Sequence, residues 1–344
     1  MAVLAAPVAA VRLAVRRALD QVGSAPIPDP PAATDPVPGT RRARVLVACS
    51  GGADSLALAA AAVFVGPRQG VDVGLVTVDH GLQAGSARRA RAVADWADRA
   101  GFAPVEVATV EVAGRPGGPE AAARDARYEA LVSAAHRHRA GTVLLGHTRD
   151  DQAETVLLAL ARGAGPRGLA GMPAVRVLDG IALCRPLLDV TRAQTRAACA
   201  ALDLTPWDDP HNTDPSYARA RVRSDLLPAL VEALGPGVVG NLARTAALVA
   251  ADTAALDALA ADHLAAARDP AGGLRVAVLA ALPAALRGRV LHAWARELGA
   301  APAALSHRHV EALDALVTAW RGQGPTFLPG GIRVARHGGH LGAG

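Results

Sequence analysis

Residues 45–55 read Val-Leu-Val-Ala-Cys-Ser-Gly-Gly-Ala-Asp-Ser, an apolar run that leads through two glycines and a carboxylate into an alanine-rich segment. The run predicts a buried strand, and the segment from about Ser55 predicts a helix. Glycines let backbone amides turn inward around an anion, and a helix N-terminus adds roughly half a positive charge. No lysine follows the glycines, so the GxxxxGK[ST] pattern is absent. We therefore expect a phosphate-binding loop that uses backbone amides.

The segments after this loop alternate short apolar runs with longer helical patterns. Strands are expected at 44–49, 72–78, 104–110 and 142–146, and helices at 54–65, 86–101, 119–139 and 150–162. Such alternation favours a parallel sheet with helices on both faces, a doubly wound α/β fold. Polar side chains that follow the strands are then expected to collect at the carboxyl edge of the sheet.

The length of 344 residues favours more than one domain, because single cores stop growing at roughly 250–300 residues. We expect an N-terminal helix and a Pro-rich linker over 1–40, the α/β domain over 41–225, and a mainly helical domain over 226–344. Apolar residues at helical spacing predict the helices of the last part, and its end suggests a short hairpin. The ranges are 222–234, 238–267, 283–298 and 306–320 for the helices and 325–341 for the hairpin.

The charge of the chain favours a polyanionic partner. The formal net charge is +5, and all 36 basic residues are arginine. A lysine nucleophile or Schiff base is therefore excluded, and any phosphate clamp must use guanidinium groups or backbone amides. Arginine can also reflect a coding bias. Aromatic residues make up only 3% of the chain, so phosphate and shape contacts are expected to dominate over base stacking.

The cysteines and the apolar runs indicate the compartment. Cys49, Cys184 and Cys199 are odd in number, widely spaced and without a CxxC pair, which favours a reduced, cytoplasmic protein without a structural zinc site. The stretch from Ala5 to Val22 is apolar but interrupted by arginines, so we expect an amphipathic surface helix. No run reaches the roughly 18 apolar residues of a membrane span.

Two further loops carry polar residues where strands are expected to end. Asp79 and His80 follow the strand at 72–78, where they could contact a nucleotide or form an ordinary turn. His147 precedes Asp150, Asp151 and Glu154 in the first turns of the helix at 150–162. A helix dipole favours ionised carboxylates there. These acids could simply cap the helix, or they could bind magnesium or an ammonium group.

Seven blocks in order resemble the tRNA(Ile)-lysidine synthetase family, within the superfamily of PP-loop ATP pyrophosphatases. The likeness covers about residues 44–230, and any single block is modest evidence. The blocks are Ser50 to Ser55, Val78-Asp79-His80-Gly81-Leu82, Glu120…Arg124…Arg127-Tyr128, Gly146 to Thr155, Arg162-Gly163…Gly168 to Met172, Arg185-Pro186-Leu187-Leu188, and Asp209-Pro210…Asn212…Asp214…Tyr217…Arg219…Arg221.

The resemblance implies a defined reaction. Members of this family adenylate the ring carbonyl oxygen of the wobble cytidine in an isoleucine tRNA with a CAU anticodon. Free L-lysine then displaces AMP and lysidine forms. The cofactors implied are ATP and Mg²⁺, and the partners are that tRNA and L-lysine, with no membrane. The oligomeric state stays open, with a homodimer as one option. Members often have an appended tRNA-holding domain, and a further C-terminal domain of some members is not expected in this chain.

Carried over by position, the first two loops would bind ATP. The nucleotide-binding residues are Ser50, Gly51, Gly52, Ala53, Asp54, Ser55, Asp79 and His80. Asp54 is also the expected metal ligand. In the third loop, Asp150 and Asp151 suit either the ammonium group of lysine or the metal, and the sequence does not separate these roles. His147 is the candidate proton acceptor, because imidazole titrates near neutrality.

Arginines in the matching blocks are candidates for phosphate charge from ATP or tRNA: Arg124, Arg127, Arg162, Arg185, Arg219, Arg221 and Arg223. On a helix, Arg219 and Arg223 would lie together while Arg221 pointed away. Solvated surface positions are the alternative. Two other functions remain open: a PP-loop tRNA thiolase, which normally needs reactive or cluster-binding cysteines, and a non-catalytic RNA-binding relic.

Overall fold

The computed structural model describes residues 5–24, 42–81, 85–112, 114, 119–209, 214–270, 272–302 and 304–344. Of the expected N-terminal helix and Pro-rich linker over 1–40, the part at 25–40 lies outside the described residues. The contacts divide the chain into two compact units, residues 1–247 and 248–344. The division falls within helix α10 (Val238–Ala267).

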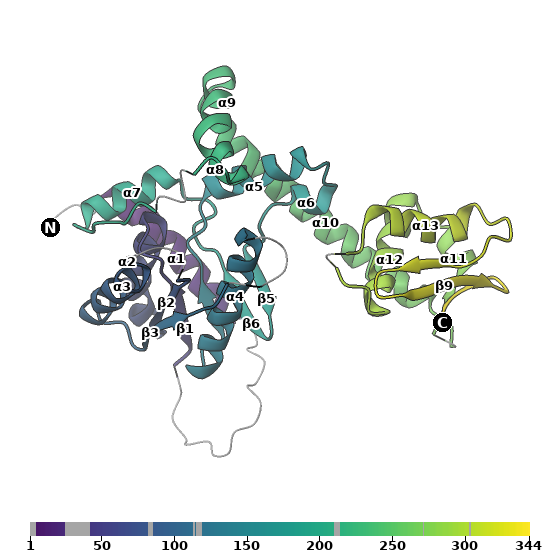
Figure 1. Ribbon diagram of the computed structural model, residues 1–344, viewed down its shortest axis with the longest axis horizontal. Coiled ribbons are helices and arrows are strands. Elements are labelled where there is room, and N and C mark those ends of the chain that lie inside the picture. Colours follow the sequence, from purple (N-terminus) through teal and green to yellow (C-terminus); the bar gives the residue numbers. More distant parts are fainter. Residues whose placement is uncertain are drawn as a thin grey trace, which may run out of the picture. The chain divides into compact units, whose positions relative to one another are not determined.

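The first unit contains a six-stranded sheet in the order β3-β2-β1-β4-β6-β5 (Figure 1). Its strands are β1 (Arg44–Ala48), β2 (Asp72–Asp79), β3 (Val105–Thr109), β4 (Thr142–Leu144), β5 (Val175–Leu178) and β6 (Ile181–Cys184). All neighbouring strands are parallel except β5, which runs antiparallel to β6 at the edge. The predicted α/β fold with a parallel sheet is confirmed. The antiparallel edge pair was not foreseen.

Helices cover both faces of this sheet because β1 alternates its side chains between two cores. Val45 and Val47 enter a core formed with α1 (Ala6–Ser24), α2 (Ala53–Val65), α3 (Ser86–Ala100) and α7 (Arg192–Ala201). Leu46 enters the opposite core with α4 (Pro119–Arg137). The predicted helices at 54–65, 86–101 and 119–139 agree with α2, α3 and α4 within two residues at each end.

The order of the strands defines where the loops meet. β1 pairs with β2 on one side and with β4 on the other, so the order in which successive strands are added to the sheet reverses between β1 and β4. Ligands of such folds bind outside the carboxyl ends of the strands at this switch point. The loop from Ser50 and the loop from His147 follow these two strands.

Several helices lie around α5 (Arg149–Ala161) after the sheet. They are α6 (Pro166–Leu169), α8 (Ala218–Arg221), the π-helical turn η3 (Val222–Leu226) and α9 (Leu227–Leu234), whereas the 3₁₀ turn η1 (Gly66–Gln69) follows α2 and contacts α1 and β2. The helix predicted from 222 therefore begins four residues earlier. Within the described chain no single helix is long and apolar enough to cross a membrane, although the bent pair 218–234 and 238–267 passes that test jointly by length and composition.

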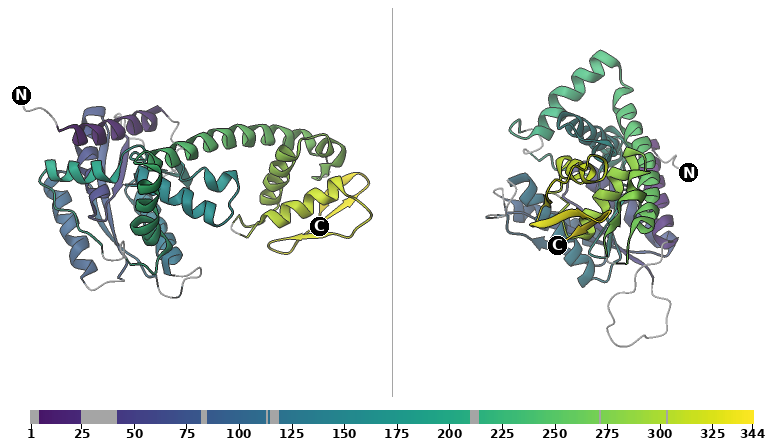
Figure 2. Two further views of the ribbon diagram at one scale, coloured as in Figure 1. Left: turned by 90° about the horizontal axis from the view of Figure 1, so that it is seen from above. Right: turned by 90° about the vertical axis from the view of Figure 1, so that its right-hand side faces the viewer.

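The second unit packs helices against a small sheet. Its elements are α11 (Val276–Ala280), α12 (Ala284–Glu297), α13 (His307–Thr318), and the strands β7 (Leu274–Arg275), β8 (Thr326–Leu328), β9 (Ile332–His337) and β10 (His340–Ala343). The strand order is β7-β10-β9-β8, so the segment predicted as a hairpin forms three strands of a four-stranded sheet. The core of this unit gathers around Trp294, Leu313 and Leu341. The strands lie beside α13 (Figure 2).

Candidate functional site

The loop after β1 has the geometry of an anion site. Gly51 has φ of +84°, and a Cβ there would meet Val93 Cγ2 at 3.0 Å, so the turn requires glycine. Gly52 precedes α2, whose N-terminus has no side-chain cap. Ser55 closes the turn, because its Oγ accepts from the Ser50 amide at 3.2 Å and donates to the Gly52 carbonyl at 2.9 Å. The first amides of α2 are therefore left for an anion.

The loop after β4 packs directly on the loop after β1. A Cβ on Gly146 would lie 3.1 Å from the Ser55 backbone, so only glycine permits this approach. Thr148 then begins α5 with a capping box, in which Asp151 Oδ2 accepts from the Thr148 amide at 2.8 Å and the Thr148 hydroxyl at 2.9 Å. Asp151 thus caps the helix, which was the simpler of the two predicted interpretations, and its other oxygen remains for further contacts.

Glu154 is the centre of a buried ion network and is fully inaccessible to solvent. Its Oε1 accepts from Arg192 at 3.1 Å and from Arg223 Nε at 2.8 Å. Its Oε2 accepts from Arg219 Nε at 2.9 Å and from Arg223 at 3.0 Å. The predicted pairing of Arg219 with Arg223 on one helical side is therefore present. Arg221 points elsewhere and donates to the carbonyls of Pro215 and Ser216 at 2.6 and 3.0 Å.

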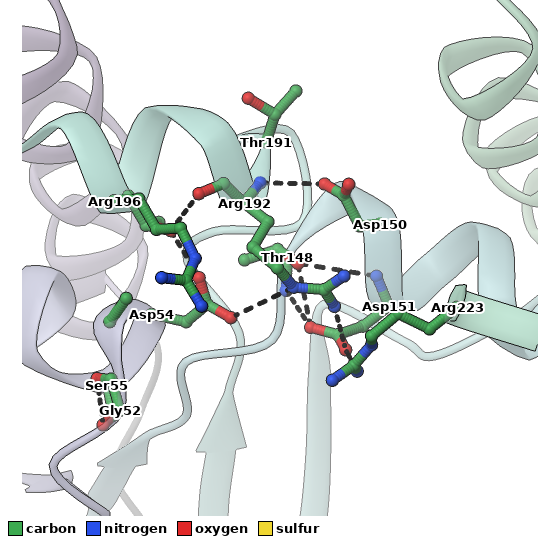
Figure 3. A network of polar contacts seen from close by, with 12 residues as sticks. Gly52, Asp54, Ser55, Thr148, Asp150, Asp151, Thr191, Arg192, Arg196 and Arg223 are labelled. Carbon is green, nitrogen blue, oxygen red and sulfur yellow. Dashed lines mark hydrogen bonds and ion pairs between the residues drawn. The ribbon is translucent and has the colours of Figure 1, made fainter. Parts of the chain in front are cut away.

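Arg192 connects this network with the loop after β1 (Figure 3). Its guanidinium donates to Asp151 Oδ1 and Glu154 Oε1, both at 3.1 Å, and its Nε lies 3.7 Å from Asp54 Oδ2. Its backbone amide donates to Asp150 Oδ2 at 2.8 Å. The hydroxyl of Thr195 donates to the other oxygen of Asp54. One helix, α7, therefore holds the acids of both loops.

The acids of the network differ in pKa because their surroundings differ. Burial raises the pKa of Asp54 above its ordinary value, and the hydrogen bond from Thr195 only partly offsets this. Burial would also raise the pKa of Asp151, but Arg192, Arg219 and the Thr148 amide outweigh it and lower the pKa overall. Asp151 is accordingly ionised at neutral pH, whereas the raised pKa of Asp54 means that a bound cation would favour its ionised form.

A second cluster beside the network is basic. Burial lowers the pKa of His147 well below its ordinary value, and the nearby charges of Arg127, Arg185, Arg219 and Arg124 lower it further. The imidazole is therefore neutral at pH 7. The sequence-predicted residues Arg124, Arg127 and Arg185 thus gather around His147, whereas Arg162 is exposed at the end of α5.

Polar atoms in the basic cluster lack partners. Buried Nδ1 of His147, Nδ1 of His80, Nε of Arg127 and Nε of Arg185 have no hydrogen-bond partner within the described residues. A buried donor without an acceptor costs about 1–3 kcal/mol, so such a set indicates a place that a ligand completes. Burial and the charge of Arg127 lower the pKa of His80, which places the loop after β2 at this cluster. Asp79 accepts from the Gly81 amide at 3.0 Å and orders the turn.

Sequence reasoning missed Arg192, Thr195, the central position of Glu154, and Trp207. The Trp207 amide donates to the Gly51 carbonyl at 2.9 Å, and its ring lies under the Arg89 guanidinium at 4.1 Å. One local signal for Arg192 exists. Thr191 and Gln194 form a capping box, so Arg192 is the first residue of α7, where the helix dipole disfavours a cation unless carboxylates lie close.

Magnesium and ATP both fit the residues present. The described residues contain no group of three or more His, Cys, Asp or Glu side chains that could hold a metal by themselves. Mg²⁺ is usually bound by one or two carboxylates together with substrate phosphates, and Asp54 beside the uncapped end of α2 can supply such a carboxylate. All three cysteines are free and buried.

The geometry defines an enzyme-like site of the PP-loop class, and the family comparisons agree. A PP-loop domain model matches residues 32–230, and a model described as the TilS substrate binding domain matches residues 274–341. By fold, the U34-tRNA thiolase NcsA from Methanococcus maripaludis is similar, with a TM-score of 0.52 and 16% identity over 70% of this chain and 78% of that one.

Relatives that match over nearly the whole chain identify the family within the PP-loop class. The chain is 68% identical over 341 residues to a tRNA(Ile)-lysidine synthase from Salinispora arenicola, covering 99% of this chain and 97% of the relative. It is 55% identical over 350 residues to the one from Streptomyces coelicolor, covering 97% of each. The chain belongs to the tRNA(Ile)-lysidine synthase family, an ATP-dependent PP-loop enzyme family.

Proposed function

We propose that this protein joins L-lysine to the wobble cytidine of the isoleucine tRNA with a CAU anticodon and forms lysidine. The single observation that carries the proposal is the uncapped N-terminus of α2 at a glycine turn, next to the buried carboxylates of α5. The relatives named above supply the substrate. The reaction would take place in the cytoplasm, as predicted from the cysteines.

The first step transfers AMP. The ring carbonyl oxygen of the cytidine attacks the α-phosphorus of ATP, the bond to the β-phosphate oxygen breaks, and pyrophosphate leaves. The amides that follow Gly52 and the hydroxyls of Ser50 and Ser55 would bind the leaving phosphates, where they stabilise developing negative charge. Asp54 would hold Mg²⁺, which neutralises phosphate charge when bound.

The second step forms the carbon–nitrogen bond. An amine of lysine attacks the activated ring carbon, and the bond between this carbon and the former carbonyl oxygen breaks. AMP leaves with that oxygen on its phosphate, and the amine loses a proton. Asp150 and Asp151 would orient the ammonium group, and Glu154 would contribute through the same network. His147 can accept the proton because it is neutral at pH 7. Its depressed pKa makes it a weak base, so positioning is expected to matter more than basicity.

The arginines divide into two proposed roles. Arg124, Arg127 and Arg185 would bind phosphates of ATP or tRNA, because they form the basic cluster with unpaired nitrogen atoms. Arg219 and Arg223 are engaged by Glu154 in this structure, so their proposed contact with tRNA phosphates requires that the network open or share them. Arg221 retains a proposed tRNA contact at the surface.

The two alternatives find less support. The similar thiolase is described with a [4Fe-4S] cluster, whereas Cys49, Cys184 and Cys199 are free thiols buried in the apolar core on one face of the sheet. Burial raises the pKa of Cys199 to about 11, which disfavours the reactive thiolate. A non-catalytic relic would not need the glycine-specific turn at Gly51 or four organised carboxylates.

The test is an incubation of the purified protein with ATP, labelled lysine and total tRNA. We expect label in one tRNA, the isoleucine species with the CAU anticodon, and no label without ATP. Label in a different tRNA would change the substrate, and tRNA-dependent ATP cleavage without lysine transfer would contradict the proposed reaction.

A further inference from the structure

The sheet of the second unit has an outer face whose residues follow from its register. Phe327 pairs with Arg333, His337 with His340, and His340 with Arg275. Directly opposite residues of antiparallel strands point to the same side, and so do residues two or four apart in one strand. These five side chains therefore share one face, here called the outer face.

The inner face of the same sheet is covered. Leu274, Leu328, Val334 and Leu341 alternate with the outer residues and are buried in the core of the unit. Helix α13 contacts β8 and β9 on that side, and α11 contacts β7. The outer face is the side that the described helices of this unit leave open.

The outer face presents an aromatic ring to solvent. Phe327 is 59% exposed, and among the aromatic residues that the structure describes it alone is exposed rather than buried or half-buried. It lies on β8, the edge strand, directly opposite the exposed Arg333. Ala335 and Gly342 also form a pair on this side, although Ala335 itself is buried. One isolated ring is not an apolar patch of the size that marks a protein interface.

The outer face carries two arginines, Arg275 and Arg333. None of the four strands contains an acidic residue. Within the described residues, the side chains of Arg333 and His337 form no ion pair, and three acids of the unit are paired elsewhere: Asp257 with Arg289, Asp314 with Arg287 and Glu297 with Arg268. Asp269 contacts His340 at 3.0 Å, but its carboxylate is only 6% exposed. A positive surface with one exposed ring fits a polyanion that carries stackable bases.

We propose that the outer face binds unpaired nucleotides of the substrate tRNA, with a base stacked on Phe327 and the neighbouring phosphates at Arg333, His337 and Arg275. This rests on the proposed function, because it assigns a contact surface to the same substrate. It is compatible with the expectation that phosphate and shape contacts dominate over base stacking, since it assigns one ring to one base.

The experiment measures the dissociation constant of the CAU-anticodon tRNA for the full chain and its variants at two salt concentrations. Phe327→Ala is expected to weaken binding on the order of ten-fold, the typical effect of losing one stacked base. Arg333→Gln is expected to weaken binding and to reduce the salt slope by about 0.7 to 0.9 for the lost phosphate contact. In steady state, KM for tRNA should rise while KM for lysine and kcat stay unchanged.

Two variants in the same unit serve as matched controls. Leu259→Ala removes another exposed apolar side chain, on α10, and Arg308→Gln removes an exposed arginine on α13, which packs against the opposite side of the sheet. Both should leave tRNA binding unchanged. Circular dichroism of every variant checks that the fold is retained.

Unchanged tRNA affinity in both Phe327→Ala and Arg333→Gln overturns the proposal. A change of sedimentation with unchanged tRNA affinity also overturns it, because the face would then join two copies of the chain. The proposed function fails separately: a wild-type protein that binds tRNA but transfers no lysine would contradict the reaction, while the affinities would still test the outer face.

Discussion

Replacement of Glu154 by glutamine tests the buried network most sharply. Glu154 has no solvent exposure and accepts hydrogen bonds from three arginines. The glutamine side chain is neutral, and its NH₂ group, a hydrogen-bond donor, would face a guanidinium group, which is also a donor. Breaking a buried ion pair costs about 3–5 kcal/mol because a charge is left without compensation. Asp151 still holds Arg192 and Arg223, so we expect the lower end, about 3 kcal/mol of unfolding free energy.

The measurement is urea unfolding followed by circular dichroism, with hydrogen exchange of the α5 amides to locate the loss in the first unit. With a slope of about 3 kcal/mol per molar urea, the midpoint should fall by about 1 M. Glu297→Gln is the matched control, since Glu297 pairs with Arg268 at the surface and such pairs contribute about 0–1 kcal/mol. Equal, small losses in both variants, or unchanged exchange in α5, would refute the reasoning.

The remaining predictions concern His147 and the glycine turn. The folded-state pKa of His147 lies below its unfolded value of about 6.5, so between these values the unfolded chain binds the extra proton and stability falls as pH drops below about 6.5. His147→Asn should remove up to about 1.4 kcal/mol per pH unit from that slope in urea titrations at pH 7 to 5.5, and an unaltered slope would show that His147 is not buried neutral. Gly51→Ala should cost about 1–2 kcal/mol and raise KM for ATP, because φ is +84° and Val93 lies 3.0 Å from the new Cβ. Gly70→Ala, at φ of +71° with open space, should cost similar stability without changing KM for ATP, and equal KM values in the two variants would count against the loop as the ATP site.

Local patterns predicted most of the fold. The alternation from Arg44 onward predicted β1 to β4 and helices α2 to α5 within a few residues, because each element carries its own period and punctuation. The pair β5 and β6 was missed, since both strands have only four residues and the edge strand β5 is largely exposed, which leaves little periodicity to detect. The end of the chain was predicted as a hairpin, because β7 lies more than 50 residues before β9 and only tertiary structure joins them to one sheet.

The sequence predicted the loops of the site but not the ion pairs that join them. The loops after β1 and β4 could be placed together from strand order alone, and they do meet through Gly146 and Ser55. The partners of Glu154 come from helices 38 to 69 residues further along, and no local pattern specifies such pairs. The sequence showed that Arg219 and Arg223 share a helical side, but not that a buried carboxylate engages them.

The most direct test of the central claim follows the phosphates of ATP at the loop after β1. The protein is mixed with the CAU-anticodon isoleucine tRNA and ATP labelled at the α-phosphate, first without lysine and then with it. We predict labelled adenylate on the tRNA and unlabelled pyrophosphate in solution, followed by release of labelled AMP when lysine is added. Formation of ADP and inorganic phosphate, with no label on the tRNA, would contradict the claim.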